Sequence, residues 1–204
     1  MEAIAENIAE QLYEKGWCIV DNFLEEGFRK ELLEEQQDIL HHGQFRMAGV
    51  GKGGDFRIQP EIRSDKVCWM DYWQLTPLQR RYWDQIEELK SAINQRCYLG
   101  LRSYEAHFAM YPPGSFYLRH LDQFQKVSYR VVSCILYLND EWSEDDGGAL
   151  RMYLPQEDGT EEILDVFPKG GRLVIFLSGE IPHEVLMTFK ERISITGWMR
   201  DIEY

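Results

Sequence analysis

Basic residues, paired cysteines and long apolar runs are all scarce in this sequence of 204 residues. Lys and Arg number 22 against 35 Asp and Glu, which gives a formal net charge of −13. Because this charge opposes binding to a phosphate backbone, we expect no nucleic-acid partner. No window is apolar enough to cross a bilayer, and the first residues lack the basic and apolar segments of a secretion signal. We therefore expect a cytoplasmic protein that does not enter a membrane.

The cysteines are few and far apart, with no C-x-x-C pair. The four are Cys18, Cys68, Cys97 and Cys134. Their spacing disfavours a structural zinc site or a disulfide framework, so reduced thiols in the core are the simplest interpretation.

What the sequence does contain is enough apolar material for one domain, with 44% hydrophobic and 13% aromatic residues. Apolar residues recur at helical spacing over 3–15, 25–41 and 77–95, which predicts three amphipathic helices. Gly16 ends the first helix, whereas Thr76 as N-cap and Pro77 in the first turn open the third. Short strands are predicted at 17–20 and 63–69.

From about residue 98 the pattern changes to short strands separated by glycine-rich and proline-rich turns. The predicted strands span 103–111, 116–122, 129–138, 149–154, 163–166, 172–177, 183–187 and 192–199. Together with the helices they predict an α+β fold, a double-stranded β-helix or jelly-roll barrel buttressed by N-terminal helices. We expect a single domain over 1–204, with helical support over 1–97 and the jelly-roll core over 98–204. The acidic turn 140–146 does not match a calcium loop, so we interpret it as a solvated hairpin.

Residues 44–65 form a glycine-rich and charged segment without sustained periodicity. Residues 49–54 match G-x-G-x-x-G, but no buried strand precedes them and no helix follows, so a dinucleotide site is rejected. Long loops in compact domains tend to bind ligands or to close over a site.

The tetrapeptide Arg119-His120-Leu121-Asp122 is the centre of the candidate site. On a strand, His120 and Asp122 leave the same face with Cβ atoms roughly 6.6 Å apart, close enough to share one metal ion. His183 opens a later strand and is the candidate third ligand, although a satisfied loop or core histidine is the alternative. The tandem His41-His42 at a helix end is better explained as a dipole partner.

Two histidines and one carboxylate leave adjacent metal positions open, which is typical of non-haem Fe(II) oxygenases. Nine residues after His183, Arg192 begins an alternating strand. If Arg192 faces inward, its charge needs an anion such as a bound dicarboxylate, held bidentately. Thr196, on the same face, could add a hydrogen bond.

Seven motifs in the second half occur in an order that resembles the 2-oxoglutarate/Fe(II)-dependent dioxygenases. They are Tyr111-Pro112, Arg119 to Asp122, Ile135 to Asn139, Trp142, Gly147 to Arg151, Pro182 to Val185 and Arg192 to Trp198. Within that family the chain most resembles the prolyl 4-hydroxylases related to the hypoxia-inducible-factor prolyl hydroxylases, in a bacterial single-domain form. The similarity covers roughly residues 60–200.

This resemblance implies Fe(II), 2-oxoglutarate and O2 as cofactors, with ascorbate as a further candidate. It implies that His120, Asp122 and His183 hold the metal and that Arg192 pairs with the far carboxylate of 2-oxoglutarate. The other residues expected around the co-substrate are Tyr137, Thr196, Tyr111, Leu150, Ile135 and Trp198. Core packing is the alternative for Tyr137 and Trp198.

The resemblance also implies a protein or peptide substrate that carries a proline, hydroxylated at C4, with release of succinate and CO2. The residues expected on the substrate side are Arg63, Asp65, Trp69 and Arg119, below a finger loop at about 44–65. Elongation factor Tu is a candidate substrate by analogy, and we expect a monomer with a role in oxygen sensing. His107 departs from the hypoxia enzymes, which carry an apolar residue at this position beside the co-substrate pocket.

Two alternatives remain open from the sequence. One is a hydroxylase of a free amino acid, a sugar or a non-prolyl side chain on the same scaffold. The other is a non-catalytic sensor that binds oxygen or 2-oxoglutarate. A long loop favours a polypeptide substrate, because a small molecule needs only a closed pocket.

Overall fold

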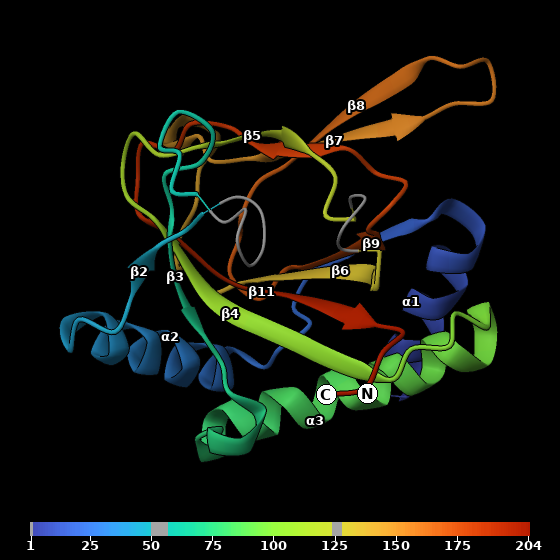
Figure 1. Ribbon diagram of the computed structural model, residues 1–204, viewed down its shortest axis with the longest axis horizontal. Helices are drawn as coiled ribbons and strands as arrows, with labels where there is room; N and C mark the ends of the chain where they lie inside the picture. The colour runs from blue at the N-terminus through green and yellow to red at the C-terminus, as the bar shows by residue number, and fades with distance from the viewer. Residues whose placement is uncertain (1, 50–56, 124–127) are drawn as a thin grey trace.

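The computed structural model describes residues 2–49, 57–123 and 128–204, arranged as two antiparallel sheets and supporting helices (Figure 1). The helices are α1 (Glu2–Lys15), α2 (Glu26–His41) and α3 (Pro77–Cys97), with short 3-10 turns η2 (Tyr72–Gln74) and η3 (Glu144–Asp146). The α+β class and the three predicted helices are therefore confirmed. No helix in the described part of the chain has the length and apolar character needed to span a membrane.

Local signals set the helix boundaries where the sequence places them. The Thr76 hydroxyl accepts a hydrogen bond from the Gln79 amide at 3.2 Å, and Pro77 occupies the first turn of α3. Gly16 ends α1 with a φ of +77°, a conformation that glycine adopts without steric cost.

The larger sheet has seven strands in the order β1-β9-β6-β11-β4-β3-β2. Its strands are β1 (Trp17–Val20), β2 (Arg46–Met47), β3 (Lys66–Trp69), β4 (Ser103–Tyr111), β6 (Arg130–Tyr137), β9 (Leu173–Leu177) and β11 (Arg192–Arg200). The smaller sheet has four strands in the order β5-β10-β7-β8. They are β5 (Tyr117–His120), β7 (Leu150–Pro155), β8 (Glu161–Val166) and β10 (His183–Val185).

The large sheet separates two apolar cores. Figure 1 shows α1 and α3 beneath this sheet, the small sheet on its other side, and the β7–β8 hairpin extending away from the body. Phe108 and Ile195 belong to the core shared with the helices, whereas their strand neighbours Ala109 and Thr196 face the small sheet. This alternation follows from the two-residue period of a strand, and it turns every second residue of β4 and β11 toward the space between the sheets.

The structure departs from the sequence expectations at three segments. The predicted strand 63–69 begins only at Lys66, and Arg63 forms an isolated bridge to Tyr117. A two-residue strand β2 pairs with β3 and was not predicted. The acidic segment 140–146 contains the 3-10 turn η3, in which the Asp146 carboxylate accepts hydrogen bonds from Ser143. Of the rejected G-x-G-x-x-G segment, residues 50–54 lie outside the described residues.

Candidate metal centre and pocket

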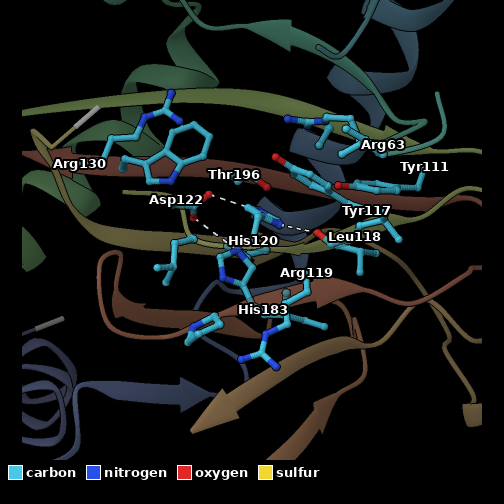
Figure 2. A pocket seen from close by; sticks show the side chains of 18 of the residues that line it. Arg63, Tyr111, Tyr117, Leu118, Arg119, His120, Asp122, Arg130, His183 and Thr196 are labelled. Atoms are coloured by element: carbon cyan, nitrogen blue, oxygen red, sulfur yellow. Dashed lines mark hydrogen bonds and ion pairs between the residues drawn. The ribbon is translucent and has the colours of Figure 1, made fainter. Parts of the chain in front are cut away.

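The structure brings His120, Asp122 and His183 together at one point between the sheets (Figure 2). His120 ends β5, and His183 begins β10 directly opposite it in the antiparallel register. Asp122 follows two residues after His120 and lies between the two imidazoles. Its Oδ1 is 3.5 Å from His120 Nε2, and its Oδ2 is 3.6 Å from His183 Nε2. One potential ligand atom from each residue lies within 4.8 Å of the others, a separation that suits one shared metal ion.

Backbone carbonyls orient both histidines. His120 Nδ1 lies 2.8 Å from the carbonyl oxygen of Leu118, and His183 Nδ1 lies 3.0 Å from that of Ile181. A carbonyl can only accept, so each Nδ1 carries the proton and each Nε2 keeps its lone pair for a metal. The residues present therefore fit a divalent ion with nitrogen and oxygen ligands.

The carboxylate of Asp122 is held from the large sheet. The hydroxyl of Ser133, on β6, donates a hydrogen bond of 2.7 Å to Asp122 Oδ2. Ser178 lies 2.8 Å from Ser133 Oγ and donates to it, because the one Ser133 proton is already committed. These two hydrogen bonds restrict the orientation of the carboxylate.

Asp122 and His183 are held in the protonation states that a metal requires. Burial alone would raise the pKa of Asp122, but the neighbouring His183 and His120 hold that pKa well below its usual range. Burial lowers the pKa of His183 to about 4, and the nearby His120 adds to the effect. Asp122 is therefore ionised and His183 neutral near pH 7, the forms that coordinate a metal.

A cavity of about 960 Å³ opens beside this cluster. This volume is ample for a small organic acid together with part of a second substrate. Ten other candidate residues were expected to line it, besides the three ligands and Arg192. Seven of them do so: Arg63, Tyr111, Arg119, Ile135, Leu150, Thr196 and Trp198. The other three, Asp65, Trp69 and Tyr137, do not appear in its wall.

Arg192 is a buried cation at the other end of this cavity, with only 2% of its surface exposed. It begins β11 opposite Tyr111 on β4, and its guanidinium lies 5.0 Å from the Tyr111 ring and 4.9 Å from the Tyr137 ring. Its Nε donates to the Gly148 carbonyl at 2.9 Å and its Nη2 donates to the Tyr137 hydroxyl at 3.2 Å. Tyr137 therefore acts on the site indirectly, by accepting a hydrogen bond that orients Arg192.

Arg192 has no carboxylate within ion-pair distance among the residues that the structure describes. An uncompensated buried cation is costly, so a ligand anion is its natural partner. Thr196, two residues beyond Ser194 on the same face of β11, lies between Arg192 and Trp198; its hydroxyl is 3.3 Å from that of Ser194.

The expected substrate-side residues take different positions. Arg63 lines the cavity and its guanidinium lies 4.3 Å above the Tyr117 ring, which in turn stacks on His120 at 3.7 Å. Asp65 is fully buried and binds Arg63 through two hydrogen bonds of 2.8 and 2.6 Å. Asp65 therefore positions Arg63 and does not itself face the cavity.

Trp69 lies outside the cavity, whereas Arg119 lines it. Trp69 is 52% exposed and packs edge-on against His107 with ring centroids 4.8 Å apart, so His107 separates it from the cavity. Arg119 pairs with Glu161 of β8 and lies 3.8 Å above the Tyr153 ring. Arg119 thus joins the cavity wall to the β7–β8 hairpin.

Three residues at the site were not predicted from the sequence: Tyr117, Arg130 and Ser133. Ser133 could have been predicted, because a lone serine within the apolar run 131–138 needs a buried hydrogen-bond partner. Arg130 lies 3.5 Å above the Trp198 ring and is held by Glu105 at 2.7 Å. Its role depends on strand pairing that one sequence does not reveal.

His41 and His42 are not part of the site. Both are exposed at the end of α2, where His42 Nδ1 lies 2.7 Å from the Asp38 carbonyl oxygen. This agrees with a helix-end role.

Residues 106–200 match the family model described as the 2OG-Fe(II) oxygenase superfamily. The chain is 33% identical to the hypoxia-inducible factor prolyl hydroxylase of Caenorhabditis elegans over 97% of its own length, but spans only 28% of that relative. It is 31% identical to the prolyl hydroxylase EGLN3 of Mus musculus, covering 100% of this chain and 86% of that protein.

Two solved structures share this fold closely. One is a Pseudomonas putida prolyl-4-hydroxylase, 40% identical with a TM-score of 0.85, covering 97% of this chain and 99% of the other. The second is a Trichoplax adhaerens prolyl hydroxylase in complex with a peptide of the hypoxia-inducible factor oxygen degradation domain. It is 29% identical with a TM-score of 0.85, covering 98% and 90% of the two chains.

Proposed function

The chain belongs to the 2OG-Fe(II) oxygenase superfamily, among its prolyl hydroxylases, and from this premise we propose that it hydroxylates C4 of a prolyl residue in a protein substrate. The observation that carries the proposal is the pairing of one metal cluster with one buried cation. His120, Asp122 and His183 converge at one end of a cavity, and Arg192 lies at the other with no carboxylate partner in the described residues. A 2-oxo dicarboxylic acid fits this arrangement, because its 2-oxo acid end can bind the metal and its far carboxylate can bind Arg192.

The roles of the residues follow from their positions. His120, Asp122 and His183 would hold Fe(II), and Arg192, supported by Tyr137, would bind the far carboxylate of 2-oxoglutarate. Ile135, Leu150 and Tyr111 would exclude water from the co-substrate, with Thr196 and Trp198 closing the wall toward the metal. Bound Fe(II) and 2-oxoglutarate supply the oxidising chemistry with O2, and the products are hydroxyproline, succinate and CO2.

The mouth of the cavity supports a polypeptide substrate. Arg63, Tyr117 and Arg119 line the cavity, together with Gly49 and Ile62 from the described parts of the segment 44–65. One solved relative carries a bound peptide, which makes peptide binding by the same scaffold the natural expectation. Elongation factor Tu remains our candidate substrate.

The two sheets would form the double-stranded β-helix as a single catalytic domain.

Metal and co-substrate binding are tested without air. Adding Fe(II) and then 2-oxoglutarate should produce a weak visible charge-transfer band, which reports chelation of the metal by the 2-oxo acid. His183→Ala should abolish the band, whereas His42→Ala, an exposed histidine outside the site, should preserve it. Full metal and co-substrate binding by His183→Ala would refute the assignment.

The reaction itself is tested by mass spectrometry. Purified elongation factor Tu and a lysate of cell proteins are incubated with the loaded enzyme and O2, and peptides are searched for the gain of one oxygen on proline. Hydroxyproline in the lysate but not in elongation factor Tu would replace the substrate and keep the reaction. Oxygen gained only on free amino acids, or only on residues other than proline, would refute the prolyl assignment. If the charge-transfer band forms but no oxidised product appears, the protein binds the metal and 2-oxoglutarate without catalysing a reaction, which would refute the proposed function.

A further inference from the structure

His107 is a buried histidine in the wall of the cavity that has no part in the proposed reaction so far. It lies on β4 directly opposite Thr196 of β11, on the face that looks toward the small sheet. Its ring packs edge-on against two neighbouring indoles, with centroids 4.8 Å from Trp69 and 5.6 Å from Trp198. Only 3% of the residue is exposed.

The hydrogen-bonding state of this imidazole is incomplete. Its Nδ1 is buried and has no hydrogen-bond partner among the described residues. Burial lowers the pKa of His107 to about 3, so the ring is neutral and carries one proton. A buried N–H without an acceptor is rarer in proteins than a buried lone pair without a donor, which places the proton on Nε2. Nε2 is at the tip of the ring, on the side that an inward-facing histidine presents to the cavity.

His107 lies opposite Thr196 and so is four strand positions away from the level of Arg192. The charges that act on it most strongly are those of Arg63, Asp65 and Arg130, and Figure 2 shows Arg63 and Arg130 on opposite sides of the metal ligands. By contrast, Arg192 is four residues from Thr196 along β11, roughly 13 Å in an extended strand. Arg192, the expected partner of the far carboxylate of 2-oxoglutarate, is thus remote from the pair formed by Thr196 and His107.

We propose that His107 is a substrate-binding residue that donates a hydrogen bond from Nε2 to a backbone carbonyl oxygen of the bound peptide. The inference rests on the proposed function and adds to it a contact on the peptide backbone. The two indoles hold the imidazole in a fixed orientation, and the absence of charge on the ring avoids repulsion with Arg63 and Arg130. Because a carbonyl is present in every peptide, the contact contributes affinity without reading the sequence that flanks the proline.

The test uses the full chain loaded with Fe(II) and 2-oxoglutarate, and as probe a library of synthetic peptides with one central proline and randomised flanks. His107→Gln places an amide N–H near the position of Nε2, whereas His107→Asn reaches only the position of Nδ1 and His107→Met has no donor. We expect His107→Met and His107→Asn to reduce kcat/KM about three- to tenfold across the whole library, and His107→Gln to recover most of it. His42→Gln is the matched surface control.

A second readout separates the peptide from the co-substrate. The charge-transfer band, titrated with 2-oxoglutarate without air and without peptide, should give the same affinity in wild type and all three His107 variants. A loss of 2-oxoglutarate affinity as large as the loss of kcat/KM would overturn the inference. Unchanged peptide kinetics in His107→Asn would also overturn it. A loss confined to particular flanking sequences would also overturn it, because it would mean that a side chain is read. Wild type that shows the band but hydroxylates no library member would instead refute the proposed function.

Discussion

Arg192 donates a hydrogen bond from Nη2 to the Tyr137 hydroxyl at 3.2 Å, so a buried cation on β11 is oriented by a neutral phenol on β6. Burial raises the pKa of Tyr137 although Arg192 opposes the shift, and the phenol stays protonated near pH 7. The hydroxyl therefore accepts from Arg192 and keeps its own proton for a second partner. Under the proposed function, the guanidinium that this phenol orients would donate to the far carboxylate of 2-oxoglutarate.

Replacing Arg192 with methionine should weaken 2-oxoglutarate binding about 10- to 100-fold, because a charge-assisted hydrogen-bonding partner is lost. The affinity is measured from the visible band without air. Pyruvate keeps the 2-oxo acid that chelates the metal but lacks the far carboxylate. Wild type and Arg192→Met should therefore bind pyruvate alike, and a loss for both acids would show that Arg192 acts on the metal end or on the fold.

Removing the Ser133 hydroxyl should weaken metal binding about 10- to 100-fold, as for other groups that orient a metal ligand. Ser133→Ala deletes the donor to Asp122, whereas Ser178→Ala deletes only the donor to Ser133. The second variant should have the smaller effect. Anaerobic titration with Fe(II) measures both, and equal losses would indicate a general packing defect at this pair.

Gly148 is expected to be intolerant of any side chain. Its φ is +65°, and an added Cβ would lie 2.9 Å from Thr188 Oγ1 and 3.2 Å from Arg192 Cδ. Gly148→Ala should therefore displace Arg192 and weaken 2-oxoglutarate binding. Gly159 is the matched control, since its φ is +81° and nothing lies within 4 Å of an added Cβ.

The two glycine variants share the backbone penalty of about 1 kcal/mol for an L-residue in the left-handed region. Urea unfolding should show this loss in Gly159→Ala with unchanged 2-oxoglutarate affinity. Gly148→Ala should lose more stability and affinity together. Normal affinity in Gly148→Ala would contradict the close approach of Arg192 to this glycine.

His107 should make the metal-free protein less stable in acid. Its pKa is about 3 in the folded chain and near 6.5 in the unfolded chain, so between these values the unfolded chain binds more protons. Stability from this group is thus full above about pH 6.5 and is lost as the pH falls, by up to about 1.4 kcal/mol per pH unit. His107→Met should unfold with a shallower pH dependence between about pH 6 and pH 4. Parallel urea curves for both proteins would contradict the burial of a neutral ring.

The helices and most strands could be predicted from the sequence because their signals are local. Periodicity, Gly16, Thr76 and Pro77 each act within a few residues of the structure they set. The H-x-D spacing likewise identified His120 and Asp122 as a pair that can share one ion, although β5 ends at His120 and Asp122 lies in the bend that follows, not on the predicted strand 116–122. These features need no knowledge of the tertiary fold.

Contacts between distant strands were harder to infer. Ser133 of β6 donates to Asp122, which follows β5, and only the folded chain brings the two residues together. Trp69 was expected at the substrate, but the pairing of β3 with β4 places His107 between it and the cavity. Such outcomes depend on the register between strands, which a single sequence does not specify.

The candidate centre draws its parts from both sheets, with His120 and His183 on the small one and Arg192 and Ser133 on the large one. A metal ion and a dicarboxylate bound between them would tie the two layers together as a non-covalent clamp. The same geometry that aligns the reactants therefore links occupancy to the resistance of the whole chain against unfolding. In cells, supply of iron and of the 2-oxo acid would then govern how long this protein survives proteolysis as well as how fast it works.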